Sequence, residues 1–540
     1  MAQGKLRKDA GMLSLLFVGV STMIGSGWLF GPMNAAKDAG PLSIGSWAIA
    51  SVVVGLIALV YAELGPMFTK SGGLMYMSLV THGRLVGRVW SWILFLAYVS
   101  IAPVEAMAVV TYADSYLHGL VNPQTLLLTG KGVEVSIAVL ALMTLFNFMI
   151  LRLVLALNTF ATWIKLCAPV GTIIVLLLFS HHPENLTVAA HASGNVAHMF
   201  IAISTAGVFF SLFGFTQAIQ LAGETSNPGR NIPISVIGTI VIGLIVFVLV
   251  QYAFVAAVPP AILARDGWSG LSFANISGPM AGLAITVGAS FWAIALFADA
   301  FISPYFCGYI WTTATSRMLM AISDEKLGPR GLTKINHYGV PWISLILTFL
   351  IGLLFFFPFP SWQKLVDYAS SATVLSYGLG CVVLLQMRRV MPDTKRPFRL
   401  WGAWIIAPIA FIASNFIMFW AGYTVVTFLF AILLAAFIVY VIYRALKPRD
   451  KDPLDWRHAW WLVPYFGGMW VLCWVGPKSM GGHDLLNIYW DMLAVAVLSL
   501  IILWIALETS VSGARSRAYY DNMVRTEVGA DVRAVGEPLP

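Results

Sequence analysis

The chain has 540 residues, of which 59% are hydrophobic and only 10% charged, and its mean hydropathy is +0.83. Soluble globular domains carry about 25% charged residues, so this composition excludes an ordinary soluble protein. The net charge of +8 does not call for a nucleic-acid partner, because the basic residues cluster in the loops on one side of the predicted membrane helices. The sequence therefore predicts an integral membrane protein.

Apolar runs recur from Met12 to Leu507, and each is close to the roughly 20 residues that a helix needs to cross a bilayer. The runs are continuously apolar rather than alternating, which predicts helices and not barrel strands. We therefore expect an all-α protein with about 14 transmembrane helices. Most Lys and Arg residues then fall on the side of the N-terminus, which predicts a multi-pass protein of the cell (inner) membrane with both termini cytoplasmic.

The first span is interrupted by the stretch STMIGSGWLFGP, residues 21–32. Irregular backbone at membrane depth is tolerated where it lines a cavity. A break at Gly25 to Gly27 would expose backbone N–H groups at the positive end of the next half-helix, where a carboxylate binds well. The alternative is that the glycines only permit close helix packing, and the sequence alone leaves both interpretations open.

Lys165 lies about two turns inside the fifth span, within residues 158–177. A lysine at the bilayer centre costs about 2.5–3.5 kcal/mol on insertion scales, so it is expected to face a cavity or a partner. Burial favours the neutral amine, which makes Lys165 a candidate proton carrier; the alternative is that it snorkels to the surface. Glu105, Asp114 and Asp299 either sense substrate or protons, or are simply hydrogen-bonded between helices.

The sixth span, residues 206–223, carries Gly214 between aromatic residues at its middle. A break near Ser211 to Gly214 would expose carbonyl groups, which suit an ammonium group. Two interrupted helices at matching places, five spans apart, are typical of inverted repeats with a binding site at the midplane. We therefore expect repeat one over residues 12–179 and repeat two, upside down, over 199–387.

The remaining segments complete the predicted organisation. They are a cytoplasmic N-terminal segment (1–11), four additional helices (403–508) and a polar cytoplasmic tail (510–540), which we expect to be disordered. The histidines of residues 180–198 and the four cysteines show no metal-ligand spacing, so no metal and no cofactor are expected.

Several motifs in order resemble the amino acid–polyamine–organocation transporters, which share the fold of the bacterial leucine transporter. They are MIGSGWLFGP (23–32), YAELGPMFTKSGGLMYMSLVTHGRLVGRVWSW (61–92), FSLFGFTQAIQLAGETSNPGRNIP (210–233) and KRPFRLWG (395–402). The resemblance covers roughly residues 12–445 and implies the two inverted repeats of five helices, with helices one and six broken. The last two predicted spans lie outside the usual pattern of that family.

The resemblance also implies roles for individual residues. The substrate carboxylate would bind at Ile24, Gly25, Ser26 and Gly27. The amino group would bind at the second break, at Phe210, Ser211, Phe213 and Gly214, with the Phe210 ring as a gate over the substrate. Lys165 would take the place of the sodium ion of sodium-coupled relatives, next to Thr22, Met23 and Ser303. Thr216 stands where many relatives carry an acidic residue, which does not favour a cationic substrate.

Two acidic residues, Glu63 and Glu224, end their helices near inner loops. Each either forms a cytoplasmic gate or pairs simply with Arg84, Arg88 or Arg230.

The predicted function is a secondary transporter that imports an amino acid with a proton by alternating access. The alternatives are an amino acid or amine exchanger and a substrate sensor that transports nothing. An enzyme is not expected, because the sequence has no HExxH or GxSxG motif and no clustered acid pair near a span end. The sequence leaves open which amino acid is bound, an acidic one included, and the oligomeric state.

Overall fold

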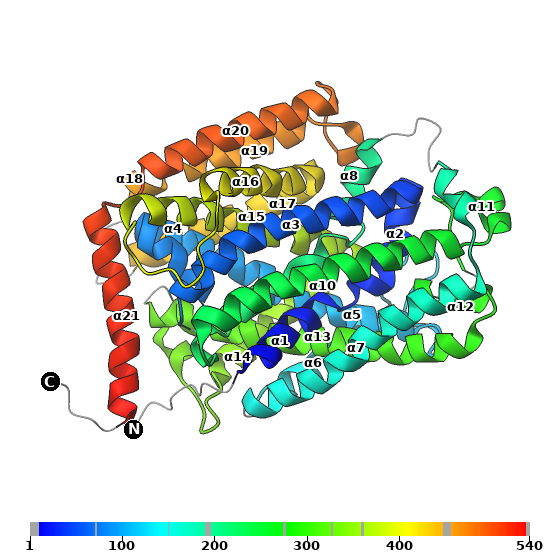
Figure 1. The fold of residues 1–540 in the computed structure, drawn as a ribbon, viewed down its shortest axis with the longest axis horizontal. Helices are drawn as coiled ribbons and strands as arrows, with labels where there is room; N and C mark the ends of the chain where they lie inside the picture. The colour runs from blue at the N-terminus through cyan, green and yellow to red at the C-terminus, as the bar shows by residue number, and fades with distance from the viewer. Residues whose placement is uncertain are drawn as a thin grey trace.

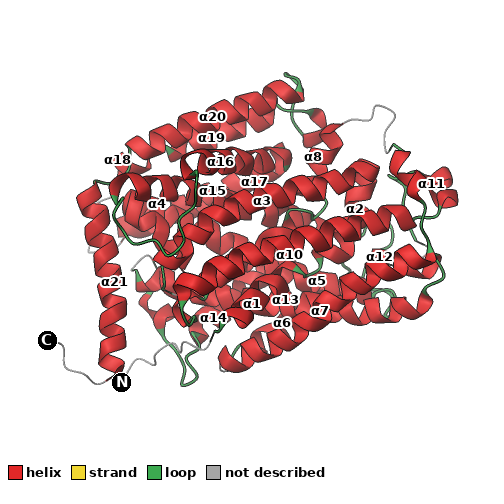
Figure 2. Ribbon diagram, in the orientation of Figure 1, coloured by secondary structure: helices red, strands yellow, loops and turns green. Residues whose placement is uncertain are grey.

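The computed structural model describes residues 10–70, 73–149, 151–189, 196–273, 277–325, 328–357, 361–446 and 455–535. In this part of the chain every named element is a helix, as Figure 2 shows. Two isolated β-bridges, Ala10 to Thr225 and Val121 to Leu128, join loops. Most of the predicted N-terminal segment 1–11 lies outside the described residues.

The α-helices of the first part of the chain are α1 (Met12–Met23), α2 (Gly27–Ala39), α3 (Ser43–Leu64), α4 (Gly73–Val99), α5 (Ile101–Ala113), α6 (Gly130–Phe146), α7 (Leu151–Phe179), α8 (Val196–Thr205), α9 (Gln217–Gln220) and α10 (Pro228–Ala257). The later ones are α11 (Pro260–Asp266), α12 (Pro279–Thr286), α13 (Ser290–Asp324), α14 (Trp342–Leu353), α15 (Trp362–Val390), α16 (Ala403–Trp420), α17 (Tyr423–Leu446), α18 (Trp456–Ala459), α19 (Leu462–Val475), α20 (Ile488–Glu508) and α21 (Gly513–Val535).

Short 3₁₀ helices connect several of these elements. They are η1 (Gly40–Leu42), η2 (Gly65–Met67), η3 (Pro183–Thr187), η4 (Phe210–Thr216), η5 (Ala222–Glu224), η6 (Arg330–Thr333), η7 (Leu354–Phe356) and η8 (Lys478–Met480).

Within the described residues, nine helical stretches are long and apolar enough to cross a membrane, or ten if one bent pair counts as a single span. Shorter apolar helices, Met12–Met23 and Trp342–Phe356, add to them. The protein is therefore a multi-pass membrane protein. The count of about 14 spans and the two inverted repeats stay predictions.

The two expected interruptions are both present in the backbone. The first separates α1 from α2 at residues 24–26. In the second, α8 ends at Thr205 and η4 follows from Phe210, so α-helical geometry is lost from residue 206 to residue 216, and the two pieces are bent by 53°. The break thus begins earlier than Ser211, and the predicted residues 211–214 lie in the 3₁₀ part of it.

Helix α1 lies near the centre of the molecule and packs against α7, α10, α13 and η4 (Figure 1). Its residues from Phe17 to Met23 are all buried, as expected of a helix that is apolar on every side. The first break is therefore enclosed by protein, where side chains from other helices can bond the backbone that the helix leaves exposed.

The C-terminal elements differ from the expected tail. Helices α19 and α20 run along one edge of the bundle, and α21 lies across the end where both chain termini are found (Figure 1). The prediction of a disordered tail is wrong for residues 513–535, which form α21. The physical reason is that α21 finds partners there: Met523 is buried, and the Tyr519 hydroxyl donates to Glu325 Oε2 at 2.5 Å.

Candidate functional site

The first break brings a backbone N–H group and a buried carboxyl group together. Ile24 ends α1 with φ −87° and ψ 77°, and α2 begins at Gly27. At this helix N-terminus the Ser26 amide donates to Oε2 of Glu105 at 2.8 Å. Glu105 comes from the middle of α5 and is fully buried. The backbone group predicted to bind a substrate carboxylate therefore holds a carboxyl group of the protein itself.

Two glycines of the break are required by close approach. A Cβ atom at Gly25 would lie 2.4 Å from Glu105 Oε1 and 2.7 Å from the sulfur of Cys307. A Cβ atom at Gly27 would lie 2.0 Å from the Ser211 hydroxyl oxygen. Gly25 thus makes room for the carboxyl, and Gly27 lets the two breaks approach each other.

The second break contacts the first directly. The Thr22 hydroxyl oxygen lies 3.2 Å from the carbonyl oxygen of Gly214, and 2.7 and 3.0 Å from two carbonyl oxygens of its own helix, so its one proton can be donated to any of the three. The carbonyl of Phe213, predicted to receive the substrate amino group, accepts from the hydroxyl of Tyr377 at 3.0 Å. The Ser211 hydroxyl donates to the Gly207 carbonyl at 2.8 Å. The predicted residues of both breaks are therefore neighbours.

Lys165 is fully buried on α7 and bonds α1 next to the break. Its Nζ donates to the carbonyl of Ser21 at 2.5 Å and to the Ser21 hydroxyl at 3.0 Å. The snorkelling alternative does not describe this side chain, because its ammonium group ends on a central helix. The partner is Ser21 rather than the neighbouring Thr22 and Met23.

Two carboxyl groups complete a charged cluster around this lysine. Lys165 interacts electrostatically with both Glu105 and Asp299. Ser303, expected beside Lys165, donates to Asp299 Oδ1 at 2.8 Å, one turn away on α13. In the described residues, Glu105 Oε1 and Asp299 Oδ2 are buried without a hydrogen-bond partner. The cluster thus combines one buried amine with two buried carboxyl groups, each of which has an oxygen that can accept a proton.

An aromatic group lies on the side of the break that faces away from the chain termini. The ring of Phe210 lies 6.2 Å from that of Trp362, which stacks on Phe30 at 4.6 Å. The indole Nε1 of Trp362 donates to the Ser26 hydroxyl at 2.8 Å. No sequence pattern pointed to Trp362, because a tryptophan at the start of an apolar run is common.

Ion pairs lie on the opposite side, near the termini. Arg317 Nε contacts Glu224 Oε1 at 2.5 Å, and both side chains are buried. Glu63 is paired with Arg388 at 2.6 Å and Arg396 at 3.1 Å. In these pairs the arginines come from α13 (Arg317), from α15 (Arg388) and from the segment after α15 (Arg396), rather than from the expected positions 84, 88 and 230.

Asp114, the remaining acidic residue singled out in the sequence, stabilises a loop through hydrogen bonds. Its Oδ1 accepts hydrogen bonds from the three consecutive amides of residues 119–121, and its Oδ2 accepts from the Ser277 hydroxyl at 3.0 Å. This side chain organises a loop at the end of α5, about two turns beyond Glu105 on the side away from the break.

Within the described residues, no group of three or more His, Cys, Asp or Glu side chains is arranged to hold a metal ion. The site offers hydrogen-bond donors, an amine and carboxyl groups. Such a set can bind a zwitterion and carry a proton.

Comparison with known proteins gives consistent matches. A family model described as amino acid permease matches residues 11–425. The chain is 36% identical over 514 residues to the glutamate/serine transporter AimA of Bacillus subtilis (strain 168), covering 94% of each protein. It is 33% identical over 512 residues to the aspartate-proton symporter of the same organism, covering 94% of this chain and 98% of that protein. These two alignments include most of the chain beyond the family model.

Proposed function

Because the chain belongs to the amino acid permease family, and is thus a transporter rather than an enzyme, we propose that it imports an amino acid together with a proton. The observation that carries this proposal is that a buried amine and a buried carboxyl bond the same interrupted helix. Lys165 donates to the carbonyl of Ser21 just before the break, and Glu105 accepts from the amide of Ser26 within it.

The proposed coupling follows from competition for one N–H group. An arriving substrate carboxylate would bind the Ser26 amide, which donates to Glu105 in this structure. Two carboxylates close together in a medium of low dielectric constant repel strongly, unless one of them takes a proton. Substrate binding and proton uptake by Glu105 would therefore favour each other.

Lys165 would complete the proton path. Its ammonium group is held by two oxygens of Ser21, and it can give up a proton to a neighbouring carboxylate when the environment changes. Loss of its charge would release α1 from α7. The proton would then leave on the side of the chain termini.

Alternating access would use the two sets of contacts on either side of the site. The ring group of Phe30, Phe210 and Trp362 would close one side, and the ion pairs of Glu63 and Glu224 would close the other. Opening one set while the other stays closed exposes the midplane to one side at a time.

The substrate is proposed to be a small amino acid, with glutamate, aspartate and serine as the first to test. Two relatives are named for transport of these compounds. Hydroxyl groups near the second break could receive a polar side chain, since the Thr216 hydroxyl lies 3.0 Å from the Tyr98 hydroxyl and 3.1 Å from that of Tyr377.

The test is uptake of labelled glutamate, aspartate and serine into proteoliposomes, with and without an inward proton gradient. We expect the gradient to drive accumulation by the wild type and by Lys364→Ala, a control at an exposed lysine. Lys165→Ala should bind substrate but lose the response to the gradient. Uptake that ignores the gradient and needs internal amino acid would identify an exchanger, and binding without any flux would identify a sensor.

A further inference from the structure

The loop of residues 391–402 joins α15 to α16 at the end of the molecule where both chain termini lie (Figure 1). It carries two of the groups that bond Glu63: Arg396 lies 3.1 Å from Oε1, and the Leu400 amide donates to Oε2 at 2.7 Å. The loop also contacts α10, because a Cβ atom at Gly229 would lie 3.1 Å from the Cβ of Pro397. It therefore passes over the end of α3, from α16 to the start of α10.

This loop and the start of α10 present three cations to the outside. Lys395 and Arg399 of the loop are exposed, and so is Arg230, which follows the Gly229 contact on α10. None of the ion pairs between described residues includes any of these three side chains. We refer to Arg230, Lys395 and Arg399 as the basic patch.

The charges next to the basic patch do not balance it. Within residues 391–402 there is one acidic residue, Asp393, against three basic ones. Burial lowers the pKa of the Arg396 guanidinium, and Glu63 opposes this shift. The like charges of Arg388 and Arg399 lower the pKa of Arg396 further. A negative charge added at the loop would therefore stabilise it.

Exposed apolar side chains place the basic patch at the membrane surface. Trp401, directly before α16, is 91% exposed, and Ile405 and Ile409, one turn apart on α16, are exposed as well. On α10, Ile234 lies one turn after Arg230 and is also exposed. Tryptophan is enriched where a membrane meets water. The basic patch thus lies at the level of the lipid head groups, with lipid-facing side chains directly beyond it.

The lipid-facing surface beneath the basic patch is continuous across three helices. Helix α3 packs against both α10 and α16 and lies between them (Figure 1). Its Val52 side chain is 58% exposed. Acyl chains that cover α3 would therefore lie between the exposed faces of α10 and α16.

We propose that the basic patch binds the phosphate of an anionic phospholipid in the leaflet on the side of the chain termini, with the acyl chains on the exposed faces of α3, α10 and α16. Each Lys or Arg near the membrane surface strengthens the binding of an anionic lipid by about fivefold. Guanidinium groups also bind phosphate through paired hydrogen bonds. A zwitterionic lipid gains less, because its own cation opposes the patch.

The basic patch and the ion pairs of Glu63 share one loop. A phosphate bound to Lys395 and Arg399 would hold the loop in place, and with it Arg396 and Leu400 against Glu63. The lipid would thus stabilise the closed state on the side of the termini. This consequence rests on the proposed function, whereas lipid binding itself is measured without transport.

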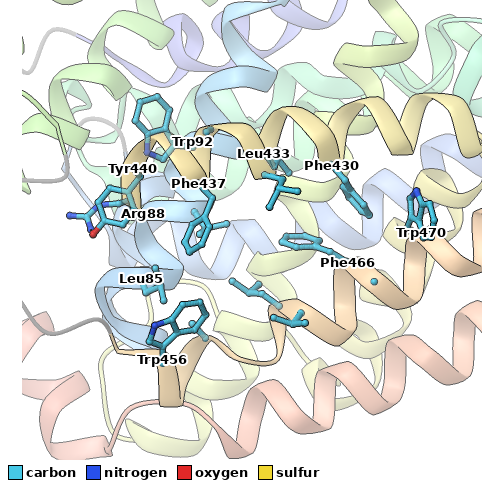
Figure 3. Close-up of a pocket in the computed structure, with 17 residues that line it drawn as sticks. Leu85, Arg88, Trp92, Phe430, Leu433, Phe437, Tyr440, Trp456, Phe466 and Trp470 are labelled. Carbon is cyan, nitrogen blue, oxygen red and sulfur yellow. The ribbon is translucent and has the colours of Figure 1, made fainter. Parts of the chain in front are cut away.

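Another membrane-facing surface provides an internal comparison. An apolar groove runs between α4, α17 and the α18–α19 segment, and Figure 3 shows aromatic side chains along its length. Among the 17 described residues that line it, Arg88 alone is charged, and its guanidinium is engaged by the ring and hydroxyl of Tyr440. We therefore expect this groove to accept acyl chains without selecting a head group.

The experiment measures lipid binding by the full-length purified protein in neutral detergent. Phosphatidylglycerol and phosphatidylcholine with identical acyl chains are titrated separately, while the thermal unfolding midpoint and the lipids retained in native mass spectrometry are recorded. A ligand that binds only the folded state raises the midpoint. We expect phosphatidylglycerol to raise it at lower concentration and to be retained as a discrete adduct.

Charge-matched variants locate the site. Lys395→Gln/Arg399→Gln should weaken phosphatidylglycerol by about tenfold or more, to the level of phosphatidylcholine, and should keep the lipid-free midpoint because both side chains are exposed. Lys334→Gln/Arg517→Gln removes the same charges from two other exposed positions and should leave the preference unchanged. Gly467→Leu, which fills part of the groove of Figure 3, should also leave the preference unchanged.

Arg230→Gln tests the patch from a different element. It should weaken phosphatidylglycerol by about fivefold, although α10 and the 391–402 loop are far apart in the sequence. It also keeps the proposal testable if the double variant of the loop proves unstable.

Three results would overturn the proposal. The first is equal binding of both lipids by the wild type, as expected of unspecific boundary lipid. The second is an unchanged preference in Lys395→Gln/Arg399→Gln or in Arg230→Gln, with a lipid-free midpoint like that of the wild type. The third is an equal loss of preference in Lys334→Gln/Arg517→Gln, which would mean that total charge and not this patch selects the lipid.

Discussion

At the scale of single residues, the first break is defined by what contacts it. Glu105 and Lys165 come from α5 and α7, and they bond Ser26 in the break and Ser21 near the end of α1. The Glu105 carboxyl has one oxygen on a backbone N–H group and the other without a partner in the described residues. This carboxyl group can therefore take up or release a proton at the second oxygen while the first oxygen keeps its hydrogen bond to the Ser26 amide.

Glu105→Gln tests this role. Glutamine keeps an oxygen that can accept from the Ser26 amide, so we expect substrate binding to persist. It cannot take up or release a proton, so gradient-driven uptake should fall. We expect a fall of about tenfold or more, because a charged hydrogen bond contributes about 1.5–3 kcal/mol and glutamine offers only a neutral one. Counterflow in the absence of a gradient should continue. Glu184→Gln, at an exposed site, serves as the control. Full gradient-driven uptake by Glu105→Gln would contradict the proposed coupling.

Gly25→Ala tests the need for close approach at the break. The added methyl group would meet Glu105 and Cys307 at 2.4 and 2.7 Å. Since the buried carboxyl of Glu105 and the sulfur of Cys307 must both shift, we expect transport to be lost while the protein still inserts in the membrane. Gly467→Ala, at a site with open space, should transport normally. The measurement is uptake normalised to purified protein, and normal uptake by Gly25→Ala would show that the break has spare room.

At the scale of elements, the chain uses buried ion pairs to tie helices together on the side of the termini. Glu224 of η5 and Arg317 of α13 are both almost fully buried, with side-chain exposures of 2% and 4%. Removing one partner of a buried pair leaves an uncompensated charge, whereas replacing both is often neutral. The pair therefore contributes more to the correct packing of η5 against α13 than to the net free energy of unfolding.

A double-mutant cycle on this pair distinguishes the two contributions. Glu224→Met alone leaves the buried Arg317 without this counter-charge and should lower the free energy of unfolding by about 3–5 kcal/mol, and the Glu224→Met/Arg317→Met double variant should recover most of it. Thermal unfolding in detergent provides the measurement. The double variant should also open more readily to the side of the termini, measured as faster labelling of the native Cys307, which is buried beside Gly25. A double variant as unstable as the single one would mean that the pair itself supplies the stability.

At the scale of the whole molecule, the distribution of charge predicts the orientation. Most Lys and Arg residues fall in segments of the sequence that the predicted topology places on the same side of the membrane as the N-terminus. The positive-inside rule places that side in the cytoplasm. Fusion of a fluorescent protein that folds only in the cytoplasm to residue 540 should give fluorescent cells, and fusion of a periplasmic phosphatase there should be inactive. Active phosphatase would reverse the orientation and with it the assignment of the two gates.

The sequence by itself determined the features that depend on local composition. Long apolar runs require membrane helices in any fold, because the backbone must satisfy its own hydrogen bonds in lipid. The same reasoning singles out Gly25, Gly27 and Lys165. Each is unfavourable in a membrane helix unless other groups of the protein satisfy its hydrogen bonds or its charge. The position of the first break agreed with the structure to within a residue.

Only the tertiary structure decided which groups provide that compensation. Glu105 is 79 residues from Ser26, Trp362 is 336 residues from Ser26, and Arg317 is 93 residues from Glu224. No local pattern encodes such pairs, because they depend on how separate helices pack around α1. For the same reason, the polar sequence of α21 predicted a disordered tail, whereas its helix forms against loops that come together only in the folded bundle.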